Sequence, residues 1–162
     1  MRKLIMASLT VCAAVLFGMD ARAQAPGYGS PGVKLEQAKK AIAAAEAEAK
    51  KNNWALAIAV TTNGGYLVHF SRMDGTQIAS IAIAQQKAKA AATFRRPTKS
   101  FADRLAQGGA GLALLTLEGV VASEGGIPIT NAQGQVIGAI GCSGATGEQD
   151  GQACQAGVNA LK

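Results

Sequence analysis

GGIPITNAQGQVIGAIGCSGATGEQD, residues 125–150, contains the clearest indications of the fold. Residues 126–130 predict an edge strand, because Pro128 has no amide hydrogen to donate to a central ladder. Residues 131–134, Asn-Ala-Gln-Gly, predict a hairpin turn, and the apolar run at residues 135–144 predicts a buried strand. The stretch therefore indicates two antiparallel strands joined by a tight turn.

The end of the same stretch predicts the start of a helix. Thr146 followed three residues later by Gln149 is the pattern of a capping box. We expect Gly138 and Gly141 to let the strand pack closely against alanine-rich helices. Two interpretations remain for the later glycines. In the first, the glycines only allow the backbone geometry of a turn. In the second, backbone amides at the helix N-terminus are exposed to an anionic ligand, at Gly144, Thr146 and Gly147.

Upstream of this stretch, the sequence predicts a helix and a second hairpin. Residues 33–52 are rich in Ala, Lys and Glu, with a narrow stripe of small side chains at helical spacing. Residues 54–62 alternate large apolar residues with alanines, which predicts a strand with one deep face and one face open to close approach of a helix. Residues 63–65, Asn-Gly-Gly, predict a tight turn into a second strand at residues 66–72.

The middle of the chain predicts two further helices and one ambiguous segment. We expect a helix at residues 77–93 with Thr76 as its N-cap, and a shorter one at residues 99–107 capped by Thr98. The apolar residues at 112–123 fit the spacing of a helix and that of a strand equally well. The segment is short and bounded by glycines, which favours a strand. Hairpins separated by helices predict a single-domain α+β fold with an antiparallel sheet.

The beginning of the chain predicts export. Residues 1–23 have a short basic start, an apolar stretch and the small-residue pattern Ala-Arg-Ala, as in a cleaved signal peptide. Residues 24–32 read as a flexible leader, so residues 33–162 form the folded domain. We therefore expect a periplasmic or secreted protein without a stable membrane anchor after cleavage. Cys142 and Cys154 form a disulfide there or remain two small buried apolar residues.

The charge and aromatic content disfavour nucleic-acid binding. The 16 Lys and Arg residues are dispersed among 10 Asp and Glu residues, and the chain has only one Trp, two Tyr and four Phe to stack on bases. Ser143 has neither the motif nor the partners of a hydrolase triad. The glycine-rich segments also lack the Lys-Ser/Thr ending of a P-loop.

Three groups of residues are candidates for ligand chemistry. His69, the single histidine, is a structural residue of its strand or an axial ligand to iron. Arg72 and Asp74 form an ion pair that locks a turn, or Arg72 acts with Lys87 to hold a ligand carboxylate. Glu124 is a further polar group at the start of a strand.

Several motifs, in the same order and at similar spacing, resemble the GlcG/HbpS family. They are RMDG at residues 72–75, the helix with Lys87 followed by TFRRPT at residues 93–98, GGIPI at residues 125–129, and GAIGCSGATGEQD at residues 138–150. The resemblance covers residues 33–162, with Cys142 where the family usually has Val or Ile. A related domain forms the C-terminal part of some corrinoid adenosyltransferases.

The resemblance implies a compact α+β fold with a five-stranded antiparallel sheet, a profilin-like sandwich, that assembles into homo-oligomers. It implies an exported haem-binding protein with an accessory or sensing role, with haem degradation as the enzymatic alternative. A protein that binds or converts a small 2-hydroxy or 2-oxo acid is the second hypothesis, and a structural oligomer without a ligand is the third. The resemblance also implies the ligand-binding candidates Arg72, Asp74, Lys87, Glu124, Gly125 and Gly126, with His69 as the candidate haem-iron ligand.

Overall fold

The computed structural model of the protein describes residues 32–162, so the predicted signal peptide and nearly all of the predicted leader lie outside the described residues. The elements follow the order α1 (Leu35–Lys51), β1 (Ala57–Thr62), β2 (Leu67–Arg72), α2 (Ala79–Phe94), α3 (Lys99–Ala106), η1 (Gly109–Thr116), β3 (Gly126–Thr130), β4 (Val136–Ser143) and α4 (Gly147–Asn159). Within this part of the chain, no helix is long and apolar enough to cross a membrane.

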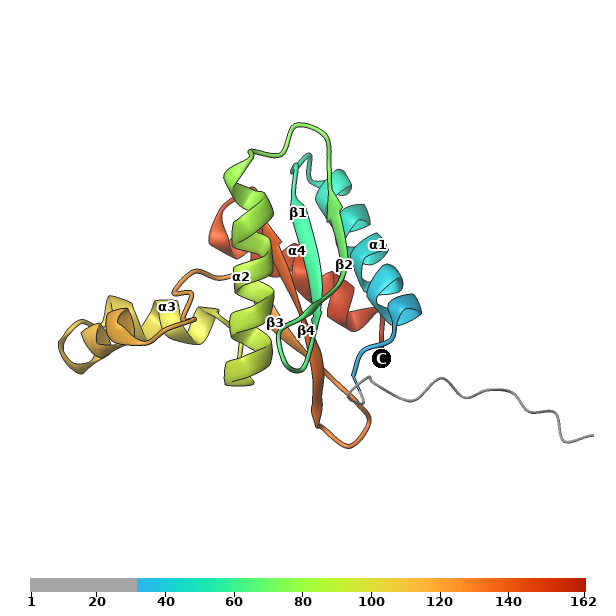
Figure 1. The fold of residues 1–162 in the computed structure, drawn as a ribbon. Coiled ribbons are helices and arrows are strands. Elements are labelled where there is room, and N and C mark those ends of the chain that lie inside the picture. Colours follow the sequence, from blue (N-terminus) through green and yellow to red (C-terminus); the bar gives the residue numbers. More distant parts are fainter. Residues whose placement is uncertain (1–31) are drawn as a thin grey trace, which may run out of the picture.

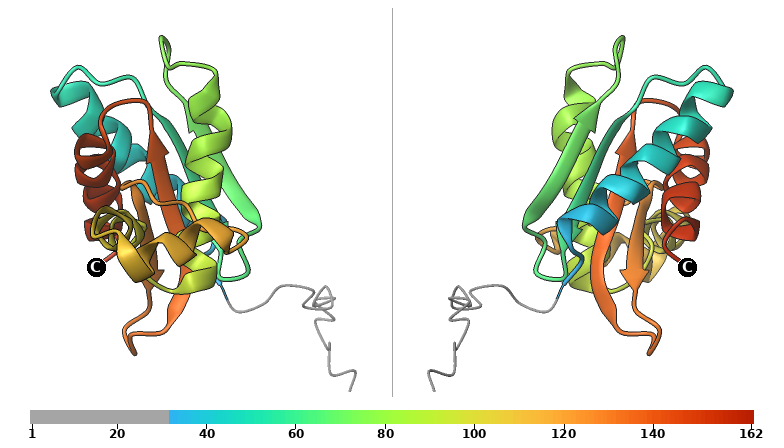
Figure 2. Two further views of the ribbon diagram at one scale, coloured as in Figure 1. Left: turned by 90° about the vertical axis from the view of Figure 1, so that its left-hand side faces the viewer. Right: turned by 90° about the vertical axis from the view of Figure 1, so that its right-hand side faces the viewer.

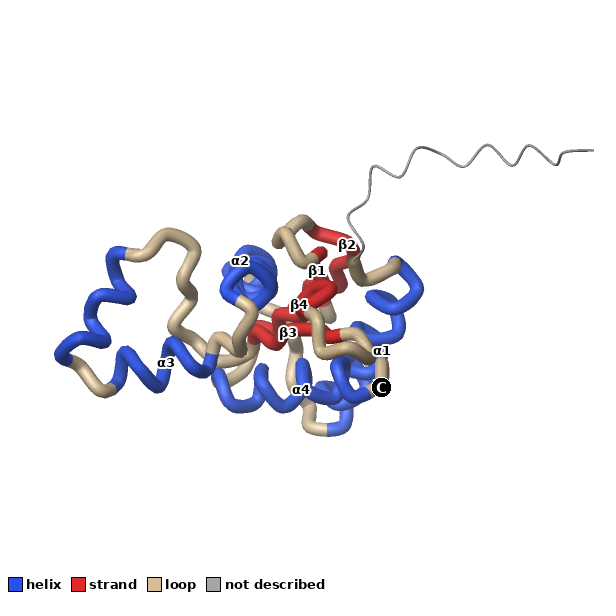
Figure 3. The backbone as a smooth tube through the Cα atoms, turned by 90° about the horizontal axis from the view of Figure 1, so that it is seen from below, coloured by secondary structure: helices blue, strands red, loops and turns tan. Residues whose placement is uncertain are grey.

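The four strands form one antiparallel sheet in the order β2-β1-β4-β3. Helices α1 and α4 cover one face of the sheet and α2 covers the other, as Figures 1 and 2 show from three sides. The view along the layers in Figure 3 places the strands between α2 and the α1–α4 pair. The prediction of an α+β fold with an antiparallel sheet is therefore confirmed.

Strand β1 has the two faces that its alternating sequence predicts. Leu56, Ile58 and Val60 belong to the main core, together with the small residues of α1 and the buried residues of α4. Ala57 and Ala59 lie on the opposite face, against Ala84 and Ala88 of α2. Because small side chains meet on that side, α2 can lie very close to the sheet.

Of the two β4 glycines, Gly141 has the predicted role and Gly138 does not. A Cβ atom on Gly141 would lie 2.1 Å from the backbone oxygen of Ala84, so only glycine allows α2 to approach β4 this closely. Gly138 has a different neighbour, because a Cβ there would meet the backbone oxygen of Thr61 and the side chain of Val33. Gly138 thus allows close contact with the neighbouring strand β1 and with Val33 ahead of α1, and not with a helix.

Of the two predicted helix caps, Thr76 is wrong, and Thr98 lies at the N-cap position of α3 but makes no side-chain cap bond. Helix α2 begins at Ala79, two residues later than predicted, and Thr76 donates its hydroxyl to the carbonyl of Met73, 2.7 Å away, in the preceding turn. Helix α3 begins at Lys99 as predicted, but the hydroxyl of Thr98 accepts the amide hydrogen of Gly126 at 2.9 Å. In both cases a partner outside the helix binds the threonine hydroxyl.

The predicted strand at residues 112–123 is wrong, and the sheet has four strands instead of five within the described residues. Residues Gly109–Thr116 form a 3-10 helix, which stands with α3 away from the body of the molecule in Figure 1. The segment lies apart from both edges of the sheet in Figure 1. A strand there would have had no neighbouring strand to pair with.

The structure decides between the two interpretations of the cysteines. Cys142 at the end of β4 and Cys154 in α4 form a disulfide, with their Cα atoms 5.8 Å apart. Both residues are fully buried in the main core. The bond fastens α4 to the strand that precedes it.

Candidate functional site

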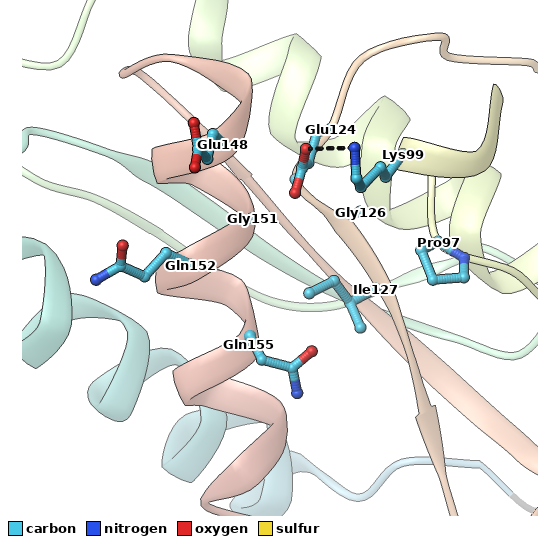
Figure 4. A pocket seen from close by; sticks show the side chains of 10 residues that line it. Pro97, Lys99, Glu124, Gly126, Ile127, Glu148, Gly151, Gln152 and Gln155 are labelled. Carbon is cyan, nitrogen blue, oxygen red and sulfur yellow. Dashed lines mark ion pairs between the residues drawn. The ribbon is translucent and has the colours of Figure 1, made fainter. Parts of the chain in front are cut away.

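A cavity of about 420 Å³ lies at the β3 edge of the sheet, between β3, α4 and the start of α3. Figure 4 shows Glu148, Gln152 and Gln155 on the α4 side and Pro97 and Lys99 on the opposite side. The cavity is lined by Pro97, Lys99, Glu124, Gly125, Gly126, Ile127, Glu148, Gly151, Gln152 and Gln155. Three of the sequence-predicted site residues, Glu124, Gly125 and Gly126, therefore lie together here.

A buried ion pair lies behind the two glycines of the cavity wall. Lys87 Nζ on α2 lies 2.8 Å from Asp150 Oδ2 on α4, and the two side chains are 2% and 3% exposed. Burial raises the pKa of Asp150, and the hydrogen bond and charge of Lys87 oppose this rise. The ion pair connects helices on opposite faces of the sheet, so Lys87 is a structural partner of Asp150 and is not free to hold a ligand carboxylate together with Arg72.

The carboxylate of Asp150 also fills the N-terminal end of α4. Its Oδ1 accepts the amide hydrogen of Ala145 at 3.1 Å, and the amide of Gly144 makes a further favourable contact. The predicted capping box is confirmed, since Thr146 and Gln149 satisfy each other's backbone amides. The chain itself therefore occupies the place that an anionic ligand group was expected to take.

Both glycines of the cavity wall are required by close contacts. Gly125 has φ of +122°, and a Cβ atom there would lie 2.8 Å from Asp150 Cβ and 3.0 Å from Lys87 Nζ. A Cβ atom on Gly126 would lie 2.4 Å from the backbone oxygen of Lys87 and 2.6 Å from a methyl group of Thr98. These glycines bring β3 against α2 and the buried ion pair, so their positions follow from packing.

Glu124 lies across the cavity mouth and bridges its two walls. Its Oε2 lies 3.6 Å from Lys99 Nζ, while Lys99 also binds Asp103 at 2.9 Å. A Cβ atom on Gly151 would lie 2.6 Å from Glu124 Oε1, so a glycine within α4 makes room for this carboxylate. The dashed line in Figure 4 marks the pair between Glu124 and Lys99.

The cavity offers mostly hydrogen-bond acceptors. Glu124 and Glu148 contribute two carboxylates, and Lys99 is already paired. Gln152 donates one amide hydrogen to Glu48 at 2.6 Å and Gln155 donates one to Asn159 at 2.9 Å, which leaves each glutamine its oxygen and one further amide hydrogen. Such a lining repels carboxylates, so it gives no support to the small-acid hypothesis.

Arg72 and Asp74 lie away from this cavity, near the end of β2 at the other edge of the sheet. Arg72 donates to the carbonyl of Thr76 at 2.9 Å, and both Arg72 and Asp74 are exposed. In residues 32–162 the two side chains do not form the predicted ion pair. The turn is instead closed by the side-chain-to-backbone bond of Arg72.

His69 also lies on β2, at the opposite edge of the sheet from the cavity. The register pairs His69 with Val60 and Ser71 with Ile58, so both side chains lie on the face that α1 covers. Ser71 donates to Glu46 of α1, whereas His69 is half-buried at the uncovered edge. Exposed Tyr66 and Leu67 precede it in the same hairpin.

Sequence reasoning missed Asp150, Lys99 and the two glutamines of α4. Asp150 gave one signal, because an acidic residue in the first turn of a predicted helix is a candidate for bonding to free amides. Its pairing with Lys87, 63 residues earlier, had no local signal. Among the described residues, no group of three or more His, Cys, Asp or Glu side chains could hold a metal ion.

Comparisons with known proteins give a consistent picture. The family model described as "Haem degrading protein HbpS-like" matches residues 33–159. Protein GlcG of Escherichia coli strain K12 is 41% identical over 108 residues, which cover 67% of this chain and 78% of GlcG.

Solved structures agree with the same family. A double mutant of HbpS from Streptomyces reticuli has a TM-score of 0.74 and 30% identity, covering 98% of this chain and 99% of that one. Klebsiella pneumoniae protein ORFY has a TM-score of 0.76 and 28% identity, covering 82% of this chain and 92% of that one.

Proposed function

The chain belongs to the HbpS-like family of haem-degrading proteins, and on this premise we propose that it binds haem outside the cytoplasm. The proposed protein is an exported homo-oligomer that binds haem in an accessory or sensing role, with haem degradation as the enzymatic alternative. The family membership supports haem as the ligand. The position of the single histidine is the observation that carries the proposal.

The cavity at the β3 edge does not fit a haem. Haem iron in proteins is held by His, Cys, Met or Tyr side chains, and the ten residues that line the cavity include none of these. The two carboxylates of Glu124 and Glu148 would also oppose the haem propionates. We therefore assign no role in haem binding to this cavity.

The surface around His69 fits a haem better. His69 is half-buried on the face that α1 covers, and its strand has no neighbour on its outer side within residues 32–162, so the imidazole is partly exposed at the edge of the sheet. Tyr66, 78% exposed, offers apolar surface in the same hairpin. Arg72 pairs with Ala57 and so lies on the other face of the strand, and it is given no role in this site. In this proposal His69 would hold the haem iron, and bound haem would supply iron chemistry at that edge.

Two observations support export. Residues 1–23 have the pattern of a signal peptide. The disulfide between Cys142 and Cys154 is a bond that persists in oxidising compartments such as the periplasm or the cell exterior. Both support a periplasmic or secreted location, and fractionation of cells that express the tagged chain would test it.

A haemin titration of the protein without residues 1–23 tests the ligand. We expect saturable binding at a fixed stoichiometry, with a sharp Soret band that is lost or shifted in His69→Ala. The control is Glu124→Gln in the cavity, which should leave the band unchanged. Weak, non-saturating adsorption would contradict haem binding, and an unchanged band in His69→Ala would remove His69 as the ligand.

The small-carboxylate hypothesis can be tested in parallel. A panel of 2-hydroxy and 2-oxo acids should give no thermal stabilisation, because Lys87 is already bound to Asp150 and the cavity is lined with acceptors. Stabilisation by one acid that disappears in Arg72→Ala would reverse this conclusion and make that acid the ligand to pursue.

A further inference from the structure

Helix α3, η1 and the residues up to Gly119 form a projection, here called the arm (residues 99–119). Figures 1 and 3 show that the arm extends sideways from the sandwich, beyond α2. Its base is held by Phe101, which is buried and packs edge-on against Phe94 with ring centroids 5.2 Å apart. A Cβ atom on Gly111 would lie 2.2 Å from the backbone oxygen of Arg104, so η1 is pressed directly onto α3.

The arm is unusually apolar for an exposed segment. Leu112, Leu115 and Leu117 are 53%, 71% and 50% exposed and lie close together in the sequence. Because the arm stands off the body, the molecule's own core cannot cover these leucines. Clustered exposed apolar residues with charged neighbours are typical of interaction surfaces.

A groove of about 570 Å³ lies between α3 and η1 on the same arm. Its lining includes the apolar side chains Phe94, Phe101, Leu114 and Leu117, and its polar lining includes Arg96, Arg104 and Asp103. Asp103 is already bound to Lys99 at 2.9 Å, so the groove has a net positive rim. The arm thus carries both a protruding leucine, Leu115, and a groove of a size to receive one.

The charges of the arm complement each other between copies. Glu118 follows Leu115 by three residues and is exposed, and it forms no ion pair with any residue the structure describes. The same holds for Arg104 on the groove rim, again among the described residues. A segment that ends in Glu118 therefore matches the positive rim of the groove in charge.

We propose that the arms of two copies pair around a two-fold axis, each placing Leu115 in the groove of the other and Glu118 beside the other's Arg104. Each chain carries both the protruding residue and the groove, which is the condition for an interface that uses the same surface twice. The inference rests on the proposed self-association and names its surface. It requires neither haem nor His69.

The first test compares two exposed positions of similar side-chain size by sedimentation equilibrium of the haem-free protein. Leu115→Ser should weaken self-association by about tenfold or more, because two apolar contacts per dimer are lost. Ile78→Ser is the matched control, since Ile78 is 79% exposed but lies at the start of α2, outside the arm. Equal association of the two variants, or a wild-type protein that stays monomeric at every concentration, would overturn the proposal.

The second test uses charge reversal to establish the two-fold pairing. Glu118→Arg should place two arginines together at each contact, and Arg104→Glu should place two carboxylates together, so each variant alone should associate weakly. An equimolar mixture should recover association close to that of the wild type, since opposite charges can then pair across the interface. Failure of the mixture to recover would exclude this arrangement.

The remaining outcomes separate the alternatives. Circular dichroism verifies that each variant is folded. If the wild-type protein is monomeric and Leu115→Ser instead abolishes its binding to anionic phospholipid vesicles, the arm is a membrane contact and the dimer proposal fails. A haemin titration of Leu115→Ser should match the wild type, so a failure of haem binding and a failure of arm pairing are recognised separately.

Discussion

The two edges of the sheet are built in opposite ways. At the β3 edge, glycines bring the strand against α2, and a buried ion pair and a disulfide tie α4 to the rest of the fold. At the β2 edge, the side chains are half-buried or exposed, and Arg72 is anchored to a single backbone carbonyl. Within the described chain, both strands have a partner on one side only.

This difference indicates that the two edges of the sheet have different roles. Close backbone contacts and buried charges tolerate few substitutions, so the β3 edge is where the fold is most sensitive. An edge with loosely packed side chains costs little to change and is free to meet a ligand. We therefore expect substitutions at the β3 edge to alter stability, and substitutions at the β2 edge to alter binding.

The largest effect is expected for Lys87→Ala. The substitution leaves the carboxylate of Asp150 buried without its cation, which should lower the free energy of unfolding by about 3–5 kcal/mol. Urea unfolding followed by circular dichroism measures this. The double variant Lys87→Met/Asp150→Leu is the control and should recover much of the loss, and a loss below about 1 kcal/mol in Lys87→Ala would contradict the role of the pair.

A smaller effect is expected for Gly126→Ala. Its methyl group would lie 2.4 Å from the backbone oxygen of Lys87, and we expect a loss of about 1–3 kcal/mol in unfolding free energy. Gly64→Ala in the β1–β2 turn is the matched control, because the nearest atoms there belong to the exposed ring of Tyr66. If both substitutions lowered the free energy of unfolding equally, the proposed difference between the two edges would be wrong.

The disulfide should contribute about 2–3 kcal/mol. Its cysteines are 12 residues apart, and closing a loop of this length in the unfolded chain stabilises the fold by that amount. The variant Cys142→Ala/Cys154→Ala should melt at a lower temperature than the oxidised wild type in scanning calorimetry. Reducing agent should lower the wild-type melting temperature and leave that of the variant unchanged, whereas an equal response in both would argue against the bond.

The raised pKa of Asp150 predicts a modest dependence of stability on pH. A carboxyl whose pKa is raised by burial contributes stability that is fully present below its ordinary value of 3.8 and is lost as the pH rises through the folded-state pKa. The difference in unfolding free energy between the wild type and Asp150→Asn should therefore fall over that window and then level off. Urea titrations at a series of pH values measure this difference, and a rise with pH would reverse the assignment.

The smallest effect on stability is expected at His69. This side chain is half-buried at an open edge, and His69→Ala should change the free energy of unfolding by no more than about 0.5 kcal/mol. The same variant should lose the Soret signal in the haemin titration, which separates binding from folding. A large loss of stability would instead make His69 a structural residue of β2.

The sequence alone determined the elements whose signals are local. The alternation of large residues and alanines identified the two faces of β1, because side chains of a strand point alternately to opposite sides. Pro128 identified an edge strand, and Thr146 with Gln149 identified the start of α4. The family resemblance was visible for the same reason, since its motifs are short runs of sequence.

Which residues contact each other across the fold became clear from the three-dimensional structure alone. Lys87 lies 63 residues from Asp150, and Thr98 binds the amide of Gly126, 28 residues later, instead of capping its own helix. The sequence pattern of residues 112–123 was compatible with both a strand and a helix. The first part of this segment belongs to a 3-10 helix, because the arm has no sheet edge beside it with which a strand could pair. Local stereochemistry favours an element within a few residues, but which groups meet depends on how the layers pack, and that information is spread over the whole chain.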